Sequence, residues 1–444
     1  MRALSSLAAR VRAAHPDHHA IAKGMAWVAA FVFLGKLAGA AKEMAIAYRY
    51  GVSAEVDAYL FVFNLVSWPV GVWFGVLSVV LVPLATGIRR GAAEGLPRFR
   101  AELLGLTLLL GGTLTWLLWS GVSLLLRTSW TGLPDATAAI AADMTPALAW
   151  LATIGVVISL LSAWTLAAGR HLNTLLEGVP AFVLLLAVLA LPGGVEPLVW
   201  GTLGGFALHL ICLAIPLVQR SEIDAPRFSR LSPHWPAFWQ GFGVMLLGQA
   251  LMSLINVIDQ FFAASLGNGA IATLGYANRV IALILGIGAT AVSRATLPVF
   301  SHANASDGAQ AHRVATHWAR LLFLLGFLST FVGWWLAPSA IALLFERGAF
   351  SAADTQAVAE VFRYGLAQIP FYFAGLVLVS YISSRRYYAL LLWSGVLAVA
   401  IKTGANAVLI PAYGISGVML AWAVAYAVNA LFFWMMLEHS KWAQ

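Results

Sequence analysis

Twelve long apolar stretches run through the sequence, and each is long enough to cross a lipid bilayer as a helix. About 20 consecutive apolar residues span the hydrocarbon core. The stretches fall near residues 22–48, 57–85, 101–126, 141–167, 174–192, 197–218, 236–265, 270–299, 315–345, 356–383, 386–410 and 414–437. Of all residues 61% are apolar and only 10% are charged, which excludes a water-soluble enzyme. The sequence therefore predicts an all-α polytopic membrane protein with about twelve transmembrane helices.

The positive charges are distributed unevenly between the segments that connect these stretches. With the N-terminus placed in the cytoplasm, 17 of the 26 Lys and Arg residues lie in cytoplasmic segments, 4 lie on the opposite side and 5 lie within spans. An excess of Lys and Arg is typical of cytoplasmic loops. Both termini are therefore predicted to be cytoplasmic. The net charge of +8 is explained by topology and by anionic lipid, not by nucleic acid.

A charged loop that contains Pro226 and Pro233, residues 220–236, separates the first six spans from the last six. Gly51 and Gly267 follow spans one and seven, and Pro83 and Pro298 lie near the ends of spans two and eight. These matching positions favour two halves related by an axis along the membrane normal, packed as two six-helix lobes around a central cavity. The predicted division is a cytoplasmic tail or interfacial helix at 1–21, an N-lobe at 22–218, a cytoplasmic linker at 219–235, a C-lobe at 236–437 and a cytoplasmic tail at 438–444.

Several ionisable residues fall within the predicted spans, where each costs about 2.5–3.5 kcal/mol on insertion scales. Span one carries Lys36, Lys42 and Glu43, and span eight carries Asn278 and Arg279. Lys36, Lys42 and Arg279 come from corresponding parts of the two halves and are predicted to converge on one cavity. Three cations against one carboxylate attract an anion, and the guanidinium fork suits phosphate. Alternatively, Lys42 and Glu43 sit at the outer end of span one and extend to the interface.

Two further charges, Asp259 in span seven and Lys402 in span eleven, are opposite in sign. Asn406 lies one helical turn after Lys402. Pairing makes each charge tolerable in hydrocarbon. The sequence leaves open whether this pair is an ion-coupling site or a structural contact.

Catalytic motifs are absent from the sequence, which contains no His-Glu-x-x-His, no P-loop and no serine elbow. Its one cysteine, Cys212, lies in an apolar run and offers neither a disulfide framework nor a cysteine metal site. We therefore expect a transporter and not an enzyme, with no cofactor and no metal.

Three stretches carry a resemblance to a known family. They are Gly35-Lys-Leu-Ala-Gly-Ala-Ala-Lys-Glu43 running through Tyr50-Gly51 to Asp57-Ala-Tyr59, then Tyr276-Ala-Asn-Arg279 followed by Leu297-Pro298, and Leu344-Phe-Glu-Arg-Gly-Ala-Phe350 with Asp354-Thr355. The third is the most specific of them. Together they resemble the MurJ-type (MviN) lipid II flippases, within the multidrug/oligosaccharidyl-lipid/polysaccharide exporter superfamily. The resemblance covers nearly the whole chain.

The resemblance implies a substrate-binding set in spans one and eight. Lys36 and Lys42 take the positions of the family's two cavity arginines in span one. Glu43 takes that of the acidic residue beside the second, and Arg279 that of the cavity arginine in span eight. In this role they would bind the pyrophosphate of a polyprenyl-linked sugar.

Other positions follow from the same resemblance. Asp57 matches an outer acidic residue that opens or closes the gate, and Asn64 and Asn278 complete the predicted substrate-binding set. Asn278 stands where the family usually has Asp. Asp259 falls where some members bind a cation, with partners in span eleven near Lys402. We hypothesise that the ammonium of Lys402 replaces that cation, which would make transport independent of sodium.

The sequence also departs from the family pattern. Lysines replace both span-one arginines, which keeps the charge but loses the bidentate fork. A run of the family that contains a further cavity arginine is replaced by Val66-Ser-Trp-Pro-Val-Gly71. The family commonly has fourteen spans, and twelve are predicted here.

These observations together predict a flippase that moves an undecaprenyl-(pyro)phosphate-linked saccharide, lipid II or a related cell-envelope precursor, across the bacterial inner membrane by alternating access. The expected partners are that lipid-linked saccharide, membrane lipids and a glycan synthase or polymerase. Two alternatives stay open: an ion-coupled drug or metabolite exporter of the same superfamily, and a non-transporting membrane scaffold for cell-surface assembly.

Overall fold

The computed structural model describes residues 16–90, 95–170, 172–306, 308–385 and 387–439. Within these ranges the regular elements are helices and no strand occurs. The first part of the chain forms α2 (Pro16–Tyr50), α3 (Ala54–Arg90), α4 (Leu96–Leu125), η1 (Ser129–Thr131), α5 (Asp135–Leu148), α6 (Trp150–Ala167), α7 (Leu172–Leu176), α8 (Val179–Ala190) and α9 (Glu196–Gln219). The second part forms α10 (Trp235–Ala264), α11 (Ala270–Ser306), α12 (Gly308–Phe345), α13 (Ala352–Leu366), α14 (Ile369–Ser384), α15 (Tyr388–Tyr413) and α16 (Ile415–His439).

Eleven helical segments among the described residues are long and apolar enough to cross a membrane. That number does not include α2, whose 35 residues correspond to about 52 Å of helix and also suffice. Two of the eleven are broken: α7 continues into α8, and α13 into α14. Pro180 and Pro370 lie in the first turn of α8 and α14, where the missing N–H is tolerated. The predicted all-α polytopic membrane fold is confirmed.

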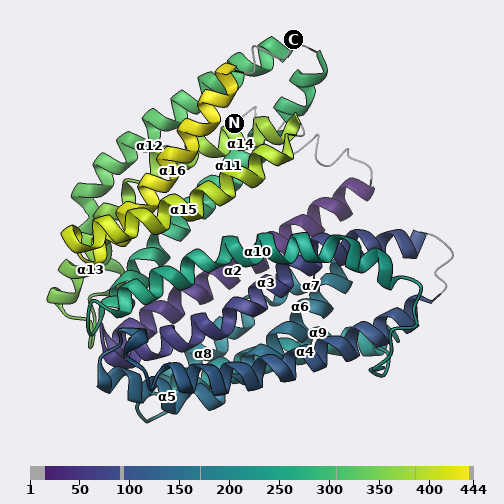
Figure 1. Ribbon diagram of the computed structural model, residues 1–444, viewed down its shortest axis with the longest axis horizontal. Coiled ribbons are helices and arrows are strands. Elements are labelled where there is room, and N and C mark those ends of the chain that lie inside the picture. Colours follow the sequence, from purple (N-terminus) through teal and green to yellow (C-terminus); the bar gives the residue numbers. More distant parts are fainter. Residues whose placement is uncertain (1–15, 91–94, 171, 307, 386, 440–444) are drawn as a thin grey trace.

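The helices form two bodies that meet at the end carrying α13 and separate toward the opposite end (Figure 1). One body contains α2 to α9, with α10 lying along it, and the other contains α11 to α16. The helix that connects them most directly is α10, since it packs against α3 and also against α15. The division into two six-helix lobes with a linker at 219–235 stays a prediction. Of the predicted tails, residues 1–15 and 440–444 lie outside the described residues.

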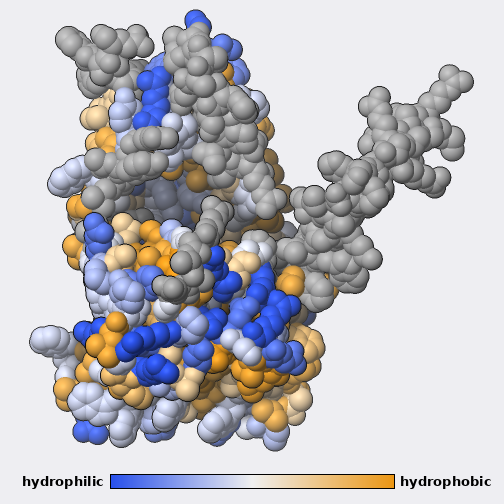
Figure 2. Space-filling view, turned by 90° about the vertical axis from the view of Figure 1, so that its right-hand side faces the viewer, coloured by the Kyte–Doolittle hydropathy of each residue, from blue (hydrophilic) through white to orange (hydrophobic). Residues whose placement is uncertain are grey.

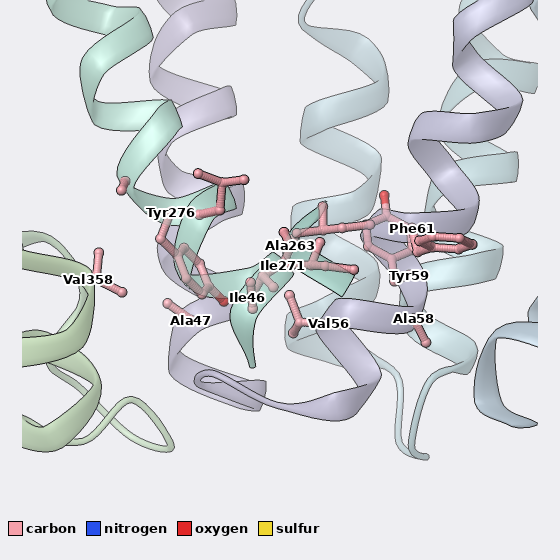
Figure 3. Close-up of a cluster of buried hydrophobic side chains, with 14 of the residues drawn as sticks. Ile46, Ala47, Val56, Ala58, Tyr59, Phe61, Ala263, Ile271, Tyr276 and Val358 are labelled. Atoms are coloured by element: carbon pink, nitrogen blue, oxygen red, sulfur yellow. The ribbon is translucent and has the colours of Figure 1, made fainter. Parts of the chain in front are cut away.

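An apolar cluster joins the two bodies at the α13 end (Figure 3). Its members include Ile46, Ala47, Val56, Phe61, Ala263, Ile271, Tyr276 and Val358. The hydroxyl of Tyr276 donates to the backbone oxygen of Gly51 at 3.0 Å, and the N–H of Ala349 donates to that of Tyr48 at 2.7 Å. Gly51 has a φ of +61°, and a Cβ there would lie 2.5 Å from the oxygen of Ala349, so this contact requires glycine. We call this region the sealed end.

At the opposite end, the connecting segment 220–234 is held against α4. Glu102 of α4 is 1% exposed, and its carboxylate accepts hydrogen bonds from the Ser229 hydroxyl, the Ser232 N–H and the Trp235 indole N–H at 2.7, 3.1 and 2.7 Å. These donors satisfy the buried carboxylate. Figure 2 faces this end and shows hydrophilic side chains gathered over the lower body.

Ion pairs also tie this segment to the helices beside it. Arg170 binds Glu222 through two nitrogens, and a terminal nitrogen of Arg100 lies 2.9 Å from a carboxylate oxygen of Asp224. Partial burial alone raises the pKa of the Glu222 carboxyl, but the hydrogen bond from Arg170 and the charges of Arg170, Arg89 and Arg100 outweigh it and lower that pKa. The segment is therefore bound to the first body by charge as well as by hydrogen bonds.

Candidate functional site

A cavity of about 430 Å³ lies between α3, α10 and α11. We call it the polar cavity, because amide and hydroxyl side chains from all three helices line it. The contribution of α3 repeats at the spacing of one helix face, with Leu60, Asn64, Ser67, Trp68 and Gly71. The contribution of α11 does the same, with Ile271, Leu274, Gly275, Asn278 and Arg279. Three helix faces therefore converge on one space.

Three of the residues predicted to bind substrate lie in this cavity. Asn64, Asn278 and Arg279 all line it. Asn64 of α3 and Asn278 of α11 are both exposed side chains that line the cavity. The structure thus brings together the α3 and α11 members of the predicted set.

Glu43 of α2 connects two of the predicted cations. Its Oε1 lies 2.7 Å from Nε of Arg279 and 2.5 Å from Nζ of Lys42. Glu43 is 8% exposed, and its second oxygen, Oε2, has no hydrogen-bond partner among the described residues. A single carboxylate is therefore shared between a lysine on its own helix and an arginine of the second body. The predicted alternative, in which Lys42 and Glu43 extend to the interface, does not describe this buried contact.

The two lysines of α2 are placed differently. Lys42 lies beside a second cavity, of about 260 Å³, together with Tyr59, Glu177 and His209. Lys36 is an exposed side chain and lines neither of these two cavities. The structure brings Lys42, Glu43 and Arg279 into contact but does not bring Lys36 to them.

Asp57, the predicted gate residue, caps α11. Its carboxylate accepts hydrogen bonds from the backbone N–H groups of Gly269 and Ala272 at 2.5 and 2.6 Å, and the residue is 1% exposed. A carboxylate at this position satisfies free N–H groups and complements the helix dipole. Asp57 therefore joins the start of α3 to the start of α11 at the sealed end.

Asp259, Lys402 and Asn406 form one buried network. Nζ of Lys402 donates to Asp259 Oδ1 at 2.5 Å, to Asn406 Oδ1 at 2.8 Å and to the backbone oxygen of Val418 at 3.1 Å. The Asn406 amide donates to Asp259 Oδ1 at 2.7 Å. Lys402 is 1% exposed and Asn406 fully buried. The network satisfies both charges and links α10, α15 and α16.

Sequence reasoning did not identify two residues of these sites. The indole N–H of Trp422 donates to Asp259 Oδ2 at 2.8 Å, and its ring lies 5.1 Å from Nζ of Lys402. Gln260 lines the polar cavity while being only 4% exposed. Both side chains are neutral, so neither produces the charge signal that marked the other residues. For Gln260 a signal existed in the helical spacing of Ser253, Asn256 and Gln260 on one face of α10.

Comparisons with known proteins relate this chain to one protein family. The protein-family model described as "Lipid II flippase MurJ" matches residues 46–443. A Rhizobium tropici protein named "Probable lipid II flippase MurJ" is 24% identical over 422 residues, covering 89% of this chain and 77% of the relative. A Bdellovibrio bacteriovorus protein of the same name is 25% identical over 237 residues, covering 53% of this chain and 45% of the relative. The latter alignment thus spans less than half of that relative.

Two solved structures share the fold. One, "Lipid II flippase MurJ, inward closed conformation", has a TM-score of 0.81 and 18% identity, covering 93% of this chain and 87% of that chain. An inward-facing MATE family transporter of the MOP superfamily has a TM-score of 0.72 and 17% identity, covering 92% and 95%. At such identities the likeness shows the fold alone. The family match over most of the sequence confirms the resemblance carried by the three motifs, and the chain belongs to the lipid II flippase MurJ family.

Proposed function

We propose that this protein moves a polyprenyl-(pyro)phosphate-linked saccharide across the bacterial inner membrane by alternating access. Family membership supports a transporter, and the polar cavity supplies a place for the head group. The observation that carries the proposal is Arg279, a cation that lines this cavity and is held there by Glu43. The isoprenoid chain would stay in the bilayer, because only the head group needs a polar path.

Phosphate binding would act on the contact between Arg279 and Glu43. A guanidinium has five N–H donors, so its contact with one Glu43 oxygen leaves donors for phosphate oxygens. A pyrophosphate that approaches Arg279 and Lys42 competes with Glu43 for both cations. Since Glu43 and Lys42 belong to α2 and Arg279 to α11, this competition would weaken a link between the two bodies.

The direction of transport follows from which end is sealed. The sealed end closes through the apolar cluster, Tyr276 with Gly51, and Asp57 with the start of α11. The 17-to-4 distribution of Lys and Arg supports placing both termini, and the opposite end, in the cytoplasm. The head group would enter from the cytoplasm and leave after the sealed end opens.

Lys402 supports an addition to this proposal, namely that sodium is not required. A carboxylate, an amide oxygen and a backbone carbonyl surround its ammonium, and oxygens of these kinds also bind metal cations. The side chain would thus supply permanently the charge that a bound cation brings.

The experiment that tests the function is a flipping assay with purified protein in proteoliposomes that contain a polyprenyl-pyrophosphate-linked saccharide. Arg279→Gln is expected to reduce the flipping rate at least about 100-fold, because a buried phosphate loses its charge-assisted hydrogen bonds. Arg127→Gln, at an exposed position after α4, is the matched control and is expected to keep the wild-type rate. Equal rates in wild type and Arg279→Gln would contradict the proposal.

A further inference from the structure

Gln260 is a buried amide without a partner. It is 4% exposed, and neither its side-chain nitrogen nor its side-chain oxygen has a hydrogen-bond partner among the described residues. Its neighbour Asp259, by contrast, accepts hydrogen bonds on both carboxylate oxygens. Leaving both ends of an amide unpaired costs free energy, and Gln260 lines the polar cavity. Gln260 therefore lies at the wall of that cavity with the donors and the acceptor of its amide unused.

The position of Gln260 is fixed by its surroundings. Asp259, one residue earlier on α10, is bound to Lys402, Asn406 and Trp422. This network holds the α10 turn that carries Gln260 against α15 and α16. A side chain on such an anchored turn is preorganised for a ligand, since little freedom is lost on binding.

The rest of the cavity wall matches Gln260 in chemistry. Asn64, Asn256 and Asn278 add amides from α3, α10 and α11. The ring of Trp68 also lines the cavity, and its indole N–H donates to the Ser253 hydroxyl at 2.9 Å, which fixes the orientation of the ring. Neutral groups that both donate and accept suit hydroxyl groups, and an oriented aromatic ring gives a flat apolar surface for a sugar ring.

We infer that Gln260 is a specificity-determining residue that binds the sugar ring next to the phosphate, through hydrogen bonds to two adjacent hydroxyl groups. The oxygen and one N–H of a carboxamide point to the same side, so they accept from one hydroxyl and donate to its neighbour. A phosphate or pyrophosphate at neutral pH offers mostly acceptors and would leave the Gln260 oxygen unpaired. In this arrangement Arg279 binds the phosphate, Gln260 binds the sugar, and the inference rests on the proposed function.

The test measures binding of two probes to the purified full chain by native mass spectrometry: polyprenyl pyrophosphate, and the same lipid carrying an uncharged disaccharide without peptide. Wild type is expected to bind the disaccharide lipid more tightly than bare polyprenyl pyrophosphate. Gln260→Leu is expected to lower affinity for the disaccharide lipid about 10-fold, the worth of one to two neutral hydrogen bonds, and to leave bare polyprenyl pyrophosphate unchanged. That unchanged binding also shows that the variant is folded.

Gln249→Leu is the matched control, because Gln249 lies on the same helix but does not line the polar cavity. It is expected to bind both probes as wild type does. Equal losses for both probes in Gln260→Leu, or no loss for the disaccharide lipid, would overturn the role of Gln260 while leaving the proposed function standing. Wild type that binds neither probe would contradict the proposed function and this inference together.

Discussion

Lys402 illustrates how single residues decide the energetics inside the membrane segments. Its ammonium is 1% exposed and donates to Asp259, Asn406 and Val418. A buried ammonium is tolerable only when acceptor oxygens bind its N–H groups in this way. The ammonium of Lys402 already neutralises the carboxylate of Asp259. A mobile metal ion would therefore find no unbalanced negative charge there.

We therefore expect the flipping rate of the wild type to be the same in NaCl and in choline chloride of equal ionic strength. Lys402→Asn removes the ammonium and leaves Asp259 with uncompensated charge, so this variant is expected to gain stabilisation by Na⁺. The measurements are initial flipping rates in proteoliposomes and melting temperatures in detergent, each with both salts. A wild-type rate that rises with Na⁺ would refute the replacement of a cation by Lys402.

Residues of this kind are readable from the sequence when they are charged. Lys42, Glu43 and Arg279 stand out because ionisable groups are rare in apolar spans, and the structure brings them into contact. Lys36 has the same signal but is exposed, since helix rotation and tilt depend on neighbouring helices that the local sequence does not encode. Gln260 gave no charge signal because its amide is neutral, and its lack of hydrogen-bond partners among the described residues is visible only in the structure.

At the scale of elements, Asp57 connects two helix starts that are far apart in sequence. It lies in the first turn of α3 and accepts hydrogen bonds from the N–H groups of Gly269 and Ala272 at the start of α11. Asp57→Ala is expected to destabilise the protein by about 1–2 kcal/mol, the usual cost of losing a helix cap. It is also expected to accelerate hydrogen exchange at the first turn of α11, which mass spectrometry of peptic peptides measures.

Asp135→Ala is the control for that experiment. Asp135 lies in the first turn of α5 but is exposed, and no side-chain hydrogen bond caps the start of α5 among the described residues. It should therefore change neither stability nor exchange by a comparable amount. Unchanged exchange at the start of α11 in Asp57→Ala would show that the cap does not hold the sealed end.

Most helices can be predicted from the apolar stretches of the sequence, but the breaks within them cannot. The apolar stretches at 174–192 and 356–383 were each expected as one helix, and each contains a break. Pro180 and Pro370 mark these breaks, but proline occurs inside other helices of this chain as well, such as Pro69 and Pro83 in α3. Whether a proline bends or interrupts a helix depends on what packs against the freed backbone groups.

For the whole molecule, the arrangement of the two bodies is the property that the sequence encodes least directly. α10 lies along the first body and packs against α3, yet its network with α15 and α16 ties it to the second (Figure 1). A helix bound to both bodies can transmit movement of one to the other. A change in the polar cavity, which α10 lines with α3 and α11, can in this way reach the sealed end.

The proposed orientation, with the sealed end outside, predicts that the polar cavity is accessible from the cytoplasm only. The chain has one cysteine, Cys212, so Cys212→Ser gives a background for single-cysteine labelling. Ser67→Cys, in the cavity lining, is expected to react with a membrane-impermeant maleimide in inside-out vesicles and to stay unmodified in right-side-out vesicles. Trp130→Cys, at a sealed-end position that is 85% exposed, is the control with the opposite expected pattern. Labelling of Ser67→Cys from the outside would mean that the sealed end opens without substrate, and identical patterns at both positions would contradict the assigned orientation.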